Sequence, residues 1–84
     1  MREADRLFLQ AVGDKVRQLR LNANLTQEKL AERCELSTNY IGNIERGEQA
    51  FAVTVAWKIA LGLRCTLSEF FSGVGETDID LSSE

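Results

Sequence analysis

Residues 27–34 and 38–46 are two short amphipathic segments separated by only three residues, and no other feature constrains the fold of this chain as strongly. Thr26 and Ser37 each precede one segment as a candidate N-cap, and Gly47 follows the second as a candidate helix stop. Isolated helices shorter than about 12 residues are marginal in water, so neither segment would be stable alone. We therefore expect two short helices that are held by packing against other helices of the same chain.

Three further helices are predicted around this pair from apolar residues that recur with helical spacing and from capping signals. Together, the predicted helices cover residues 4–23, 27–34, 38–46, 53–63 and 67–72. No segment alternates for long with the period of two that a half-buried strand shows, so the expected fold class is all-α, a compact domain of five helices. The apolar positions that define the two longest helices are Leu9, Val12, Val16, Leu19, Val53, Ala56, Ile59, Ala60 and Leu63.

The 84 residues are expected to form one small domain over residues 1–72, followed by a flexible acidic tail over residues 73–84. The formal net charge of the whole chain is −3. Residues 1–72 hold ten Lys and Arg against nine Asp and Glu, so the folded part carries +1, and the tail carries four acids and no base. The acidic balance of the chain therefore does not describe the surface of its domain.

Targeting signals, cofactor ligands and catalytic arrangements are not evident in the sequence. The N-terminus does not read as a signal peptide and no span is apolar enough for a membrane helix, so we expect a cytoplasmic protein. Cys34 and Cys65 lack CxxC spacing, and the chain has no His, so we expect reduced cysteines rather than a disulfide, no metal site and no cofactor. Without His or an activated Ser or Cys, an enzyme is the least supported of the functional classes.

The two short helices with their tight connection have the sequence form of a helix-turn-helix, whose second helix enters the major groove of DNA. Ile41 and Ile44 define an inner face of that second helix. The outer row is made of Thr38, Asn39, Gly42, Asn43 and Arg46. Asn can pair with adenine, the Thr methyl can contact thymine, and Arg can hold phosphate or guanine, while Gly42 would let the helix approach the groove floor.

Two interpretations of that outer row are open. It could be an ordinary solvated face, but such faces are usually filled with Glu and Lys, which suit helices better than Asn, Gly and Thr do. A row of poor helix formers that can read bases favours the DNA-binding interpretation.

Glu45 shares the inner face with Ile41 and Ile44, and a carboxylate buried there requires a partner. Arg20 lies one turn beyond Val16 on the inner edge of the first helix. We expect an ion pair between Arg20 and Glu45 that ties the first helix to the third. The alternative is that the Glu45 side chain reaches solvent at the rim of the domain.

The run LTQEKLAERCELSTNYIGNIERG, continued by WKIALGL and TLSEFF, resembles the lambda-repressor-like (Cro/repressor, XRE-type) helix-turn-helix transcriptional regulators of bacteria and phages. The resemblance covers roughly residues 13 to 71. It implies a compact lambda-repressor-like DNA-binding domain, a regulator that binds a DNA operator, and a bacterial or phage-encoded gene. The family includes small phage repressors, antitoxins and restriction-modification controller proteins.

Roles for individual residues are implied by the same resemblance. Gln27 matches a position that binds a backbone phosphate and braces the recognition helix, and Arg20 and Glu45 match the family's internal ion pair. The positions expected at bases are Thr38, Asn39 and Asn43, and those expected at phosphates are Thr26, Gln27, Ser37, Tyr40 and Arg46. Departures from the family's pattern are Glu35 and Arg64 in place of helix-ending Gly, Phe51 and Ala52 in place of Pro and a cap, and Glu48 in place of Lys.

Family members usually bind two-fold operators as dimers, with half-sites about 34 Å apart, and often associate through their last helix. A domain of this size cannot easily enclose all its aromatic side chains, although each is by default a core residue. The dimer face of a homodimer is therefore expected among Trp57, Leu61, Phe70 and Phe71.

Two functions from different classes remain at this point. The first is a sequence-specific regulator, a repressor or controller-type protein that binds a palindromic operator as a homodimer with residues 38–46 in the major groove. The second is a helix-turn-helix module used for protein contact, such as an antitoxin or adaptor whose acidic tail binds a partner.

Overall fold

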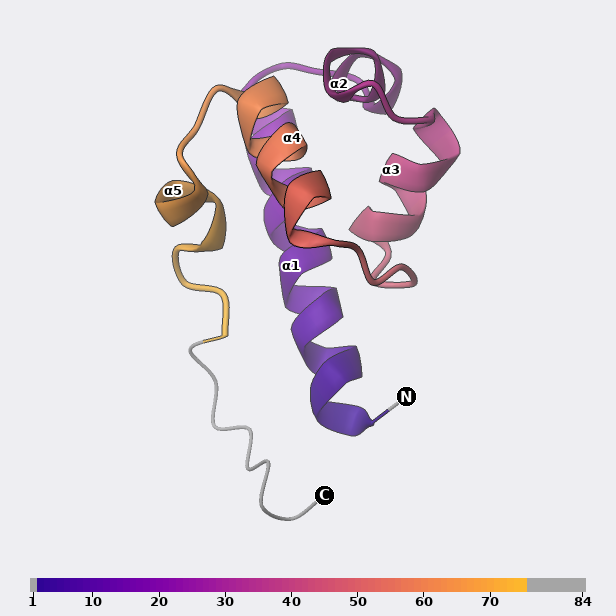
Figure 1. Cartoon of the computed structure of the whole chain (residues 1–84), viewed down its shortest axis with the longest axis vertical. Helices are drawn as coiled ribbons and strands as arrows, with labels where there is room; N and C mark the ends of the chain where they lie inside the picture. Colours follow the sequence, from indigo (N-terminus) through magenta and orange to yellow (C-terminus); the bar gives the residue numbers. More distant parts are fainter. Residues whose placement is uncertain (1, 76–84) are drawn as a thin grey trace.

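The computed structural model describes residues 2–75, which form five helices and no strand (Figure 1). The helices are α1 (Glu3–Asn22), α2 (Gln27–Cys34), α3 (Thr38–Glu45), α4 (Val53–Leu63) and α5 (Leu67–Phe71). The expected all-α, five-helix fold is confirmed. The limits of α2 and α4 agree with the prediction, whereas α1, α3 and α5 differ from it by one residue at one or both ends. Within residues 2–75, no helix is long and apolar enough to cross a membrane.

Side-chain caps fix the starts of the three short helices. Thr26 Oγ1 accepts a hydrogen bond from the backbone N–H of Lys29 at 3.0 Å, and Ser37 Oγ accepts one from Tyr40 at 3.0 Å. Thr66 and Glu69 form the expected capping box at the start of α5. Each such cap contributes about 1 kcal/mol to the stability of its helix, which is a large contribution for a helix of only two turns.

Three helices are followed by a left-handed residue that is not glycine: Asn24 lies two residues after α1 with φ 59°, and Glu35 and Arg64 directly follow α2 and α4. Glu35 after α2 has φ 57° and Arg64 after α4 has φ 59°. In both turns the next backbone N–H reaches back to a carbonyl five residues earlier, from Leu36 to Ala31 and from Cys65 to Ala60. The turns therefore keep the glycine geometry, at a cost of roughly 1 to 2 kcal/mol for each left-handed side chain.

Helix α1 forms the spine of the domain, and Figure 1 shows the other four helices gathered around its C-terminal half. It packs against α3 on one side and α5 on the other, while α2 contacts α3 and α4. The buried side chains meet between these helices and form one core: Val12, Val16, Leu25, Leu30, Ala31, Cys34, Ile41, Ile44, Ala56, Ile59, Ala60 and Phe70.

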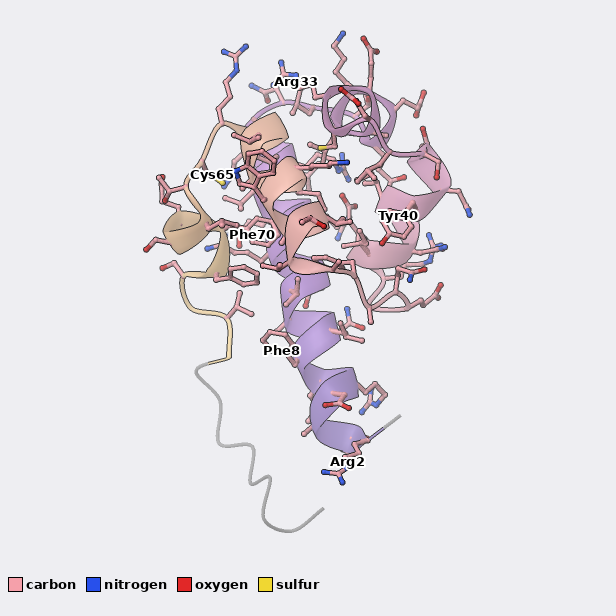
Figure 2. All side chains as sticks on the ribbon, viewed as in Figure 1. Arg2, Phe8, Arg33, Tyr40, Cys65 and Phe70 are labelled. Carbon is pink, nitrogen blue, oxygen red and sulfur yellow. The ribbon has the colours of Figure 1, made fainter. Side chains whose placement is uncertain are left out.

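Two expectations about apolar residues are wrong. Val53 was expected on the core face of its helix but is 73% exposed, because it is the first residue of α4 and the buried positions of that helix begin at Ala56. Phe70, by default a core residue, was also named among the candidates for a dimer face; it is fully buried, so the core assignment holds and the dimer-face assignment is wrong. Its ring packs edge-on against Phe71 within the domain, and Figure 2 shows it between α5 and α1.

Helices α1 and α3 approach each other backbone to backbone at Gly13. A Cβ atom built on this residue would lie 2.3 Å from the carbonyl oxygen of Ile44 and 2.7 Å from that of Glu45. No side chain fits at these distances, so the absence of a Cβ at position 13 sets how closely the C-terminal end of α3 sits on α1.

The chain after α5 turns back toward α1. Lys15 Nζ donates to the carbonyl oxygen of Ser72 at 3.0 Å, and the half-buried Val74 packs against the core. The expected acidic tail lies outside the described residues from residue 76 onward.

Candidate nucleic-acid interface

The third helix presents two distinct faces. Ile41 and Ile44 are buried to 0% and 1% exposure and fix the inner face against α1 and α2. On the outer side Thr38 and Asn39 are exposed and Asn43 is half-buried. The three residues expected to contact bases therefore share the accessible side of a helix whose other side is locked into the core.

Arg20 and Glu45 form a buried, two-armed ion pair between α1 and the end of α3. Arg20 Nε donates to Glu45 Oε2 at 2.7 Å and Nη2 donates to Oε1 at 3.1 Å. The remaining guanidinium nitrogen, Nη1, donates to the carbonyl oxygen of Leu25 at 2.8 Å. The Arg20 side chain is 10% exposed and that of Glu45 is 3% exposed. The expected ion pair is therefore present and buried, and Glu45 does not reach solvent.

Gln27 connects the start of α2 to the same carboxylate. Its Nε2 donates to Glu45 Oε1 at 3.0 Å, which leaves its second amide N–H free for another acceptor. This contact places the N-terminus of α2 beside the C-terminal end of α3. The geometry suits a residue that braces α3 and also faces outward.

The cap residues Thr26 and Ser37 keep a donor available. Each hydroxyl uses an oxygen lone pair to accept from the helix backbone, so its O–H can donate to an external oxygen. Both residues are exposed. Tyr40, labelled on α3 in Figure 2, is half-buried with its ring against the core.

Arg46 lies where the sequence suggested an open gap. Gly42 was expected to leave the helix backbone accessible, but it is buried, and the nearest atom to a Cβ built there is Arg46 Nη1 at 3.1 Å. The guanidinium folds back over this glycine and donates to Asn43 and Glu48. The gap in the outer row is therefore filled by the Arg46 side chain, and the Gly42 backbone is not accessible in this structure as was expected.

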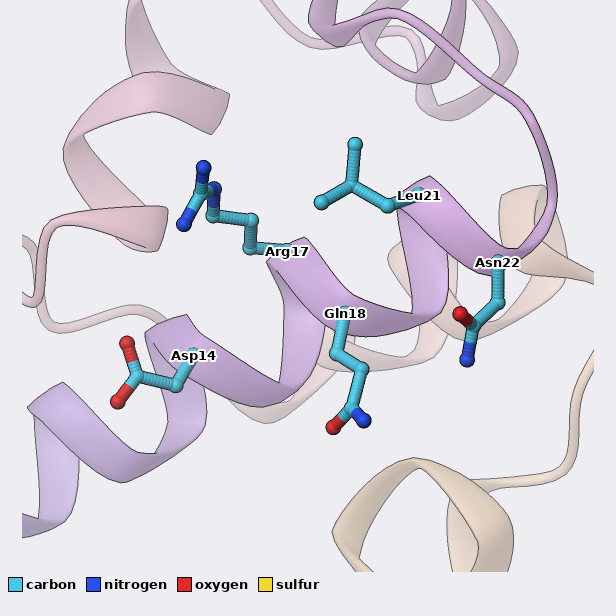
Figure 3. A pocket seen from close by; sticks show the side chains of 5 residues that line it. All are labelled: Asp14, Arg17, Gln18, Leu21 and Asn22. Atoms are coloured by element: carbon cyan, nitrogen blue, oxygen red, sulfur yellow. The ribbon is translucent and has the colours of Figure 1, made fainter.

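Arg17 is a candidate that the sequence analysis missed. It lines a hollow of about 510 Å³ together with residues of α1, the start of α2 and the end of α3, and within residues 2–75 no acid lies at ion-pair distance from it. Figure 3 shows the Arg17 side chain leaving α1 on the side of α3, whereas Gln18 points the other way. Helical arithmetic could have found it, because Gly13, Arg17 and Arg20 follow at i, i+4 and i+7. The lining residues are Gln10, Asp14, Arg17, Gln27, Glu45, Arg46 and Glu48.

The polar groups lie at both ends of α3. Ser37 is at the N-terminal end, and Gln27, Arg46 and Arg17 surround the C-terminal end. An α-helix rises 1.5 Å per residue, so the eight residues of α3 span about 12 Å, which is close to the width of the major groove of B-DNA. Donors at the two ends are thus spaced to meet the two phosphate backbones, and the accessible side of α3 between them holds Thr38, Asn39 and Asn43, the residues expected at base edges.

The expected dimer face is only partly at the surface. Trp57 is 51% exposed and Leu61 56% exposed, one helical turn apart on α4, and Val53 extends the same stripe toward the start of the helix. Phe71 is half-buried, and Phe70 belongs to the core. Of the four residues expected there, only Trp57 and Leu61 form an exposed apolar pair.

The two thiols are free, and their surroundings do not activate them. Burial raises the pKa of the Cys34 thiol to about 11. Burial and the nearby Glu69 carboxylate also raise the pKa of Cys65. Both groups are therefore neutral near pH 7, so neither supplies a thiolate nucleophile.

Comparison with known proteins places this geometry in a family. The family model described as Helix-turn-helix (HTH_3) matches residues 16–70. The control protein C.BamHI of Bacillus amyloliquefaciens is 46% identical over 52 residues, which are 61% of this chain and 64% of that protein, so the match spans less than two thirds of this relative.

Two solved structures resemble the fold closely. The restriction-modification controller protein C.AhdI from Aeromonas hydrophila has a TM-score of 0.73 and 33% identity, over 75% of this chain and 96% of its own. The C.Esp1396I controller tetramer, solved in complex with its natural 35 base-pair operator, has a TM-score of 0.75 and 30% identity, over 80% of this chain and 88% of its own. Since the family model covers α2, α3 and α4 completely together with part of α1 and most of α5, the chain belongs to the helix-turn-helix (HTH_3) family.

Proposed function

We propose that this protein is a sequence-specific DNA-binding transcriptional regulator of the repressor or controller type. It binds a palindromic operator as a homodimer and inserts α3 into the major groove. The observation that carries this proposal is the outer face of α3, where Thr38, Asn39 and Asn43 are accessible on a helix whose inner face is fixed by the core and by the Arg20–Glu45 pair.

The resemblance to controller proteins supports the same class of function. One of the matched structures holds a controller tetramer on its operator, and both solved structures are of restriction-modification controller proteins. These properties are those of the relatives. For this chain they favour a DNA operator as the partner over the protein-contact alternative, which depended on an acidic tail that lies outside the described residues from residue 76.

Charge is consistent with base reading rather than with binding through bulk electrostatics. The outer face of α3 carries Arg46 as its basic residue, with Arg17 nearby, and its other polar side chains are uncharged. Phosphate contacts set affinity and its salt dependence, whereas contacts to base edges set specificity. We therefore expect modest affinity for random DNA and a large ratio between operator and random DNA.

Selection of double-stranded DNA from a random pool by the full chain tests the proposal. The expected result is a palindromic consensus, with half-sites about one helical turn (~34 Å) or a multiple of it apart. Asn39→Ala and Asn43→Ala should each remove preference at one position per half-site while the fold is retained. Asn22→Ala, an exposed Asn at the end of α1, is the matched control and should leave the consensus unchanged. A folded wild-type protein that enriches no sequence would overturn the proposal.

The homodimer is proposed to form through the exposed stripe of α4. Leu61→Glu should produce a folded monomer in sedimentation, since a charge would be buried in the apolar contact. Leu7→Glu is the matched control, because Leu7 is a comparably exposed Leu at 42%, on the N-terminal part of α1. If Leu7→Glu is monomeric and Leu61→Glu remains dimeric, the dimer interface lies on α1 and not on α4.

A further inference from the structure

The guanidinium of Arg46 is held across the outer face of α3 by two acceptors. Its Nη2 donates to Asn43 Oδ1 at 2.5 Å, and its Nε donates to Glu48 Oε2 at 3.2 Å. Its Nη1 lies over Gly42, 3.1 Å from where a Cβ would be, so a larger residue at position 42 would push the group outward. Arg46 is the C-cap residue of α3. Its side chain folds back along the helix, so that its charge lies beside Asn43, one of the expected base-reading residues.

The contact with Arg46 decides how the Asn43 amide is oriented. An unattached Asn amide can rotate and present either its oxygen or its NH₂ group to a base edge. In this structure the oxygen accepts from a charged donor, which makes a shorter and stronger bond than a neutral one. The NH₂ group is therefore directed to the other side, and the amide offers a donor.

We propose that Arg46 is a positioning residue that fixes Asn43 as a hydrogen-bond donor to the operator, in addition to any phosphate contact of its own. This inference rests on the proposed function. In the major groove guanine presents N7 and O6, adenine N7, and thymine O4 as acceptors, whereas cytosine presents an N4 donor. With its NH₂ group held toward the DNA, Asn43 can donate to guanine, adenine or thymine on the strand it contacts, but not to cytosine N4, which is itself a donor.

Glu48 also holds the Arg46 guanidinium in place, through the nitrogen Nε. With Nε bound to Glu48 and Nη2 bound to Asn43, the guanidinium is fixed at two points. The pair between Arg46 and Glu48 is exposed, with side chains at 55% and 60%, so it contributes little to stability. The contact with Glu48 limits the positions that the Arg46 side chain can adopt before DNA is bound.

The test compares base preference, not affinity alone, in Arg46→Met. Asn43→Ala first identifies the operator position read by Asn43, as the one whose preference disappears. Wild-type protein should disfavour cytosine there by about tenfold or more, the range for a good contact to a base edge. In Arg46→Met the amide can rotate and its oxygen can accept from cytosine N4, so that discrimination should fall to about threefold or less.

Two further variants separate positioning from simple loss of charge. Arg17→Gln removes another exposed cation of the same surface, and should weaken binding to all sequences while cytosine stays disfavoured. In the Asn43→Ala background, Arg46→Met should change affinity but not base preference, which is the non-additivity expected of two coupled residues. Circular dichroism on each variant establishes folding, which an exposed side chain such as Arg46 should not affect.

Two results would overturn the inference in distinguishable ways. If Arg46→Met binds more weakly but still rejects cytosine as the wild-type protein does, Arg46 is a phosphate contact alone and the proposed function stands. If the wild-type protein selects no DNA sequence, the proposed function fails and the positioning role fails with it.

Discussion

Arg20 and Glu45 lie 25 residues apart in the chain and join α1 to the end of α3 through two hydrogen bonds of 2.7 and 3.1 Å. Gln27 adds a third contact to the same carboxylate, so three helices meet at one buried charge. The pair fixes where α3 ends relative to α1 and to the start of α2. The orientation of Thr38, Asn39 and Asn43, the proposed base-reading residues, therefore depends on a contact buried on the inner side of α3.

Removing one side of this pair should destabilise the domain strongly. Glu45→Ala leaves the Arg20 guanidinium buried with only the Leu25 carbonyl, which should cost about 3 to 5 kcal/mol. The double variant Arg20→Met with Glu45→Leu removes both charges and should recover most of that loss. Urea unfolding followed by circular dichroism measures both values. A double variant as unstable as Glu45→Ala would show that the loss comes from packing rather than from an unpaired charge.

Gly13→Ala should destabilise the domain although alanine is the better helix former. The added Cβ would lie 2.3 Å from the Ile44 carbonyl oxygen, so α1 and α3 must move apart. Overpacking of this kind costs about 1 to 3 kcal/mol, more than the roughly 0.5 to 1 kcal/mol gained from helix propensity. The midpoint of thermal unfolding should fall, whereas Gln18→Ala, on an exposed side of the same helix, should leave it nearly unchanged. An unchanged midpoint for Gly13→Ala would mean that the two helices can separate freely.

Substitution of Ser37 should separate helix stability from DNA affinity. Ser37→Ala loses the cap to the Tyr40 N–H and should cost about 1 kcal/mol, whereas Ser37→Asp keeps an oxygen acceptor there and should stay within about 0.5 kcal/mol of wild type. Affinity for the selected operator should follow a different order. Asp places a negative charge beside the expected phosphate, so Ser37→Asp should bind more weakly than Ser37→Ala. Affinities that simply follow stability would contradict a phosphate contact at this position.

Stability should fall at alkaline pH through Cys34. Its pKa is raised by burial to about 11 in the folded protein, against an ordinary value of 9.0. Between these values the unfolded chain has released the thiol proton and the folded chain has not, so the free energy of unfolding decreases as pH rises and is fully retained only below about pH 9. Urea unfolding under reducing conditions at pH 8 and pH 10.5 should show a larger decrease for the wild-type protein than for Cys34→Ala. Equal decreases would place the alkaline transition on other groups.

The sequence was sufficient for the parts of the fold that depend on local signals. Caps and helix spacing predicted all five helices, and the i, i+3, i+4 relation of Ile41, Ile44 and Glu45 predicted the buried partner of Arg20. Periodicity identifies a face of a helix but not which neighbour covers it. For that reason the burial of Val53 was predicted wrongly, and the sequence left Phe70 open between the core and a dimer face.

The site was predicted less completely because its details depend on tertiary geometry. The fold of Arg46 over Gly42 depends on rotamers and on the loop that carries Glu48, which no spacing rule describes. Arg17 reaches the candidate interface only because α1 passes beside both the start of α2 and the end of α3. Helical spacing could have placed Arg17 on the same side of α1 as Gly13 and Arg20, but its proximity to the start of α2 and the end of α3 follows only from the packing of the three helices.

Arg17 should contribute to operator binding through counterion release. Each phosphate neutralised by a Lys or Arg steepens the dependence of log K on log salt by about 0.9, so loss of one contact in each protomer of a dimer should make the slope shallower by about 2. Arg17→Gln, measured by fluorescence anisotropy from 50 to 200 mM salt, should show this change together with weaker binding to operator and random DNA alike. Arg6→Gln removes a cation that pairs with Glu3 near the far end of α1, and should leave the slope unchanged. If both variants change the slope equally, the effect is one of net charge, and the hollow beside α3 does not hold a phosphate.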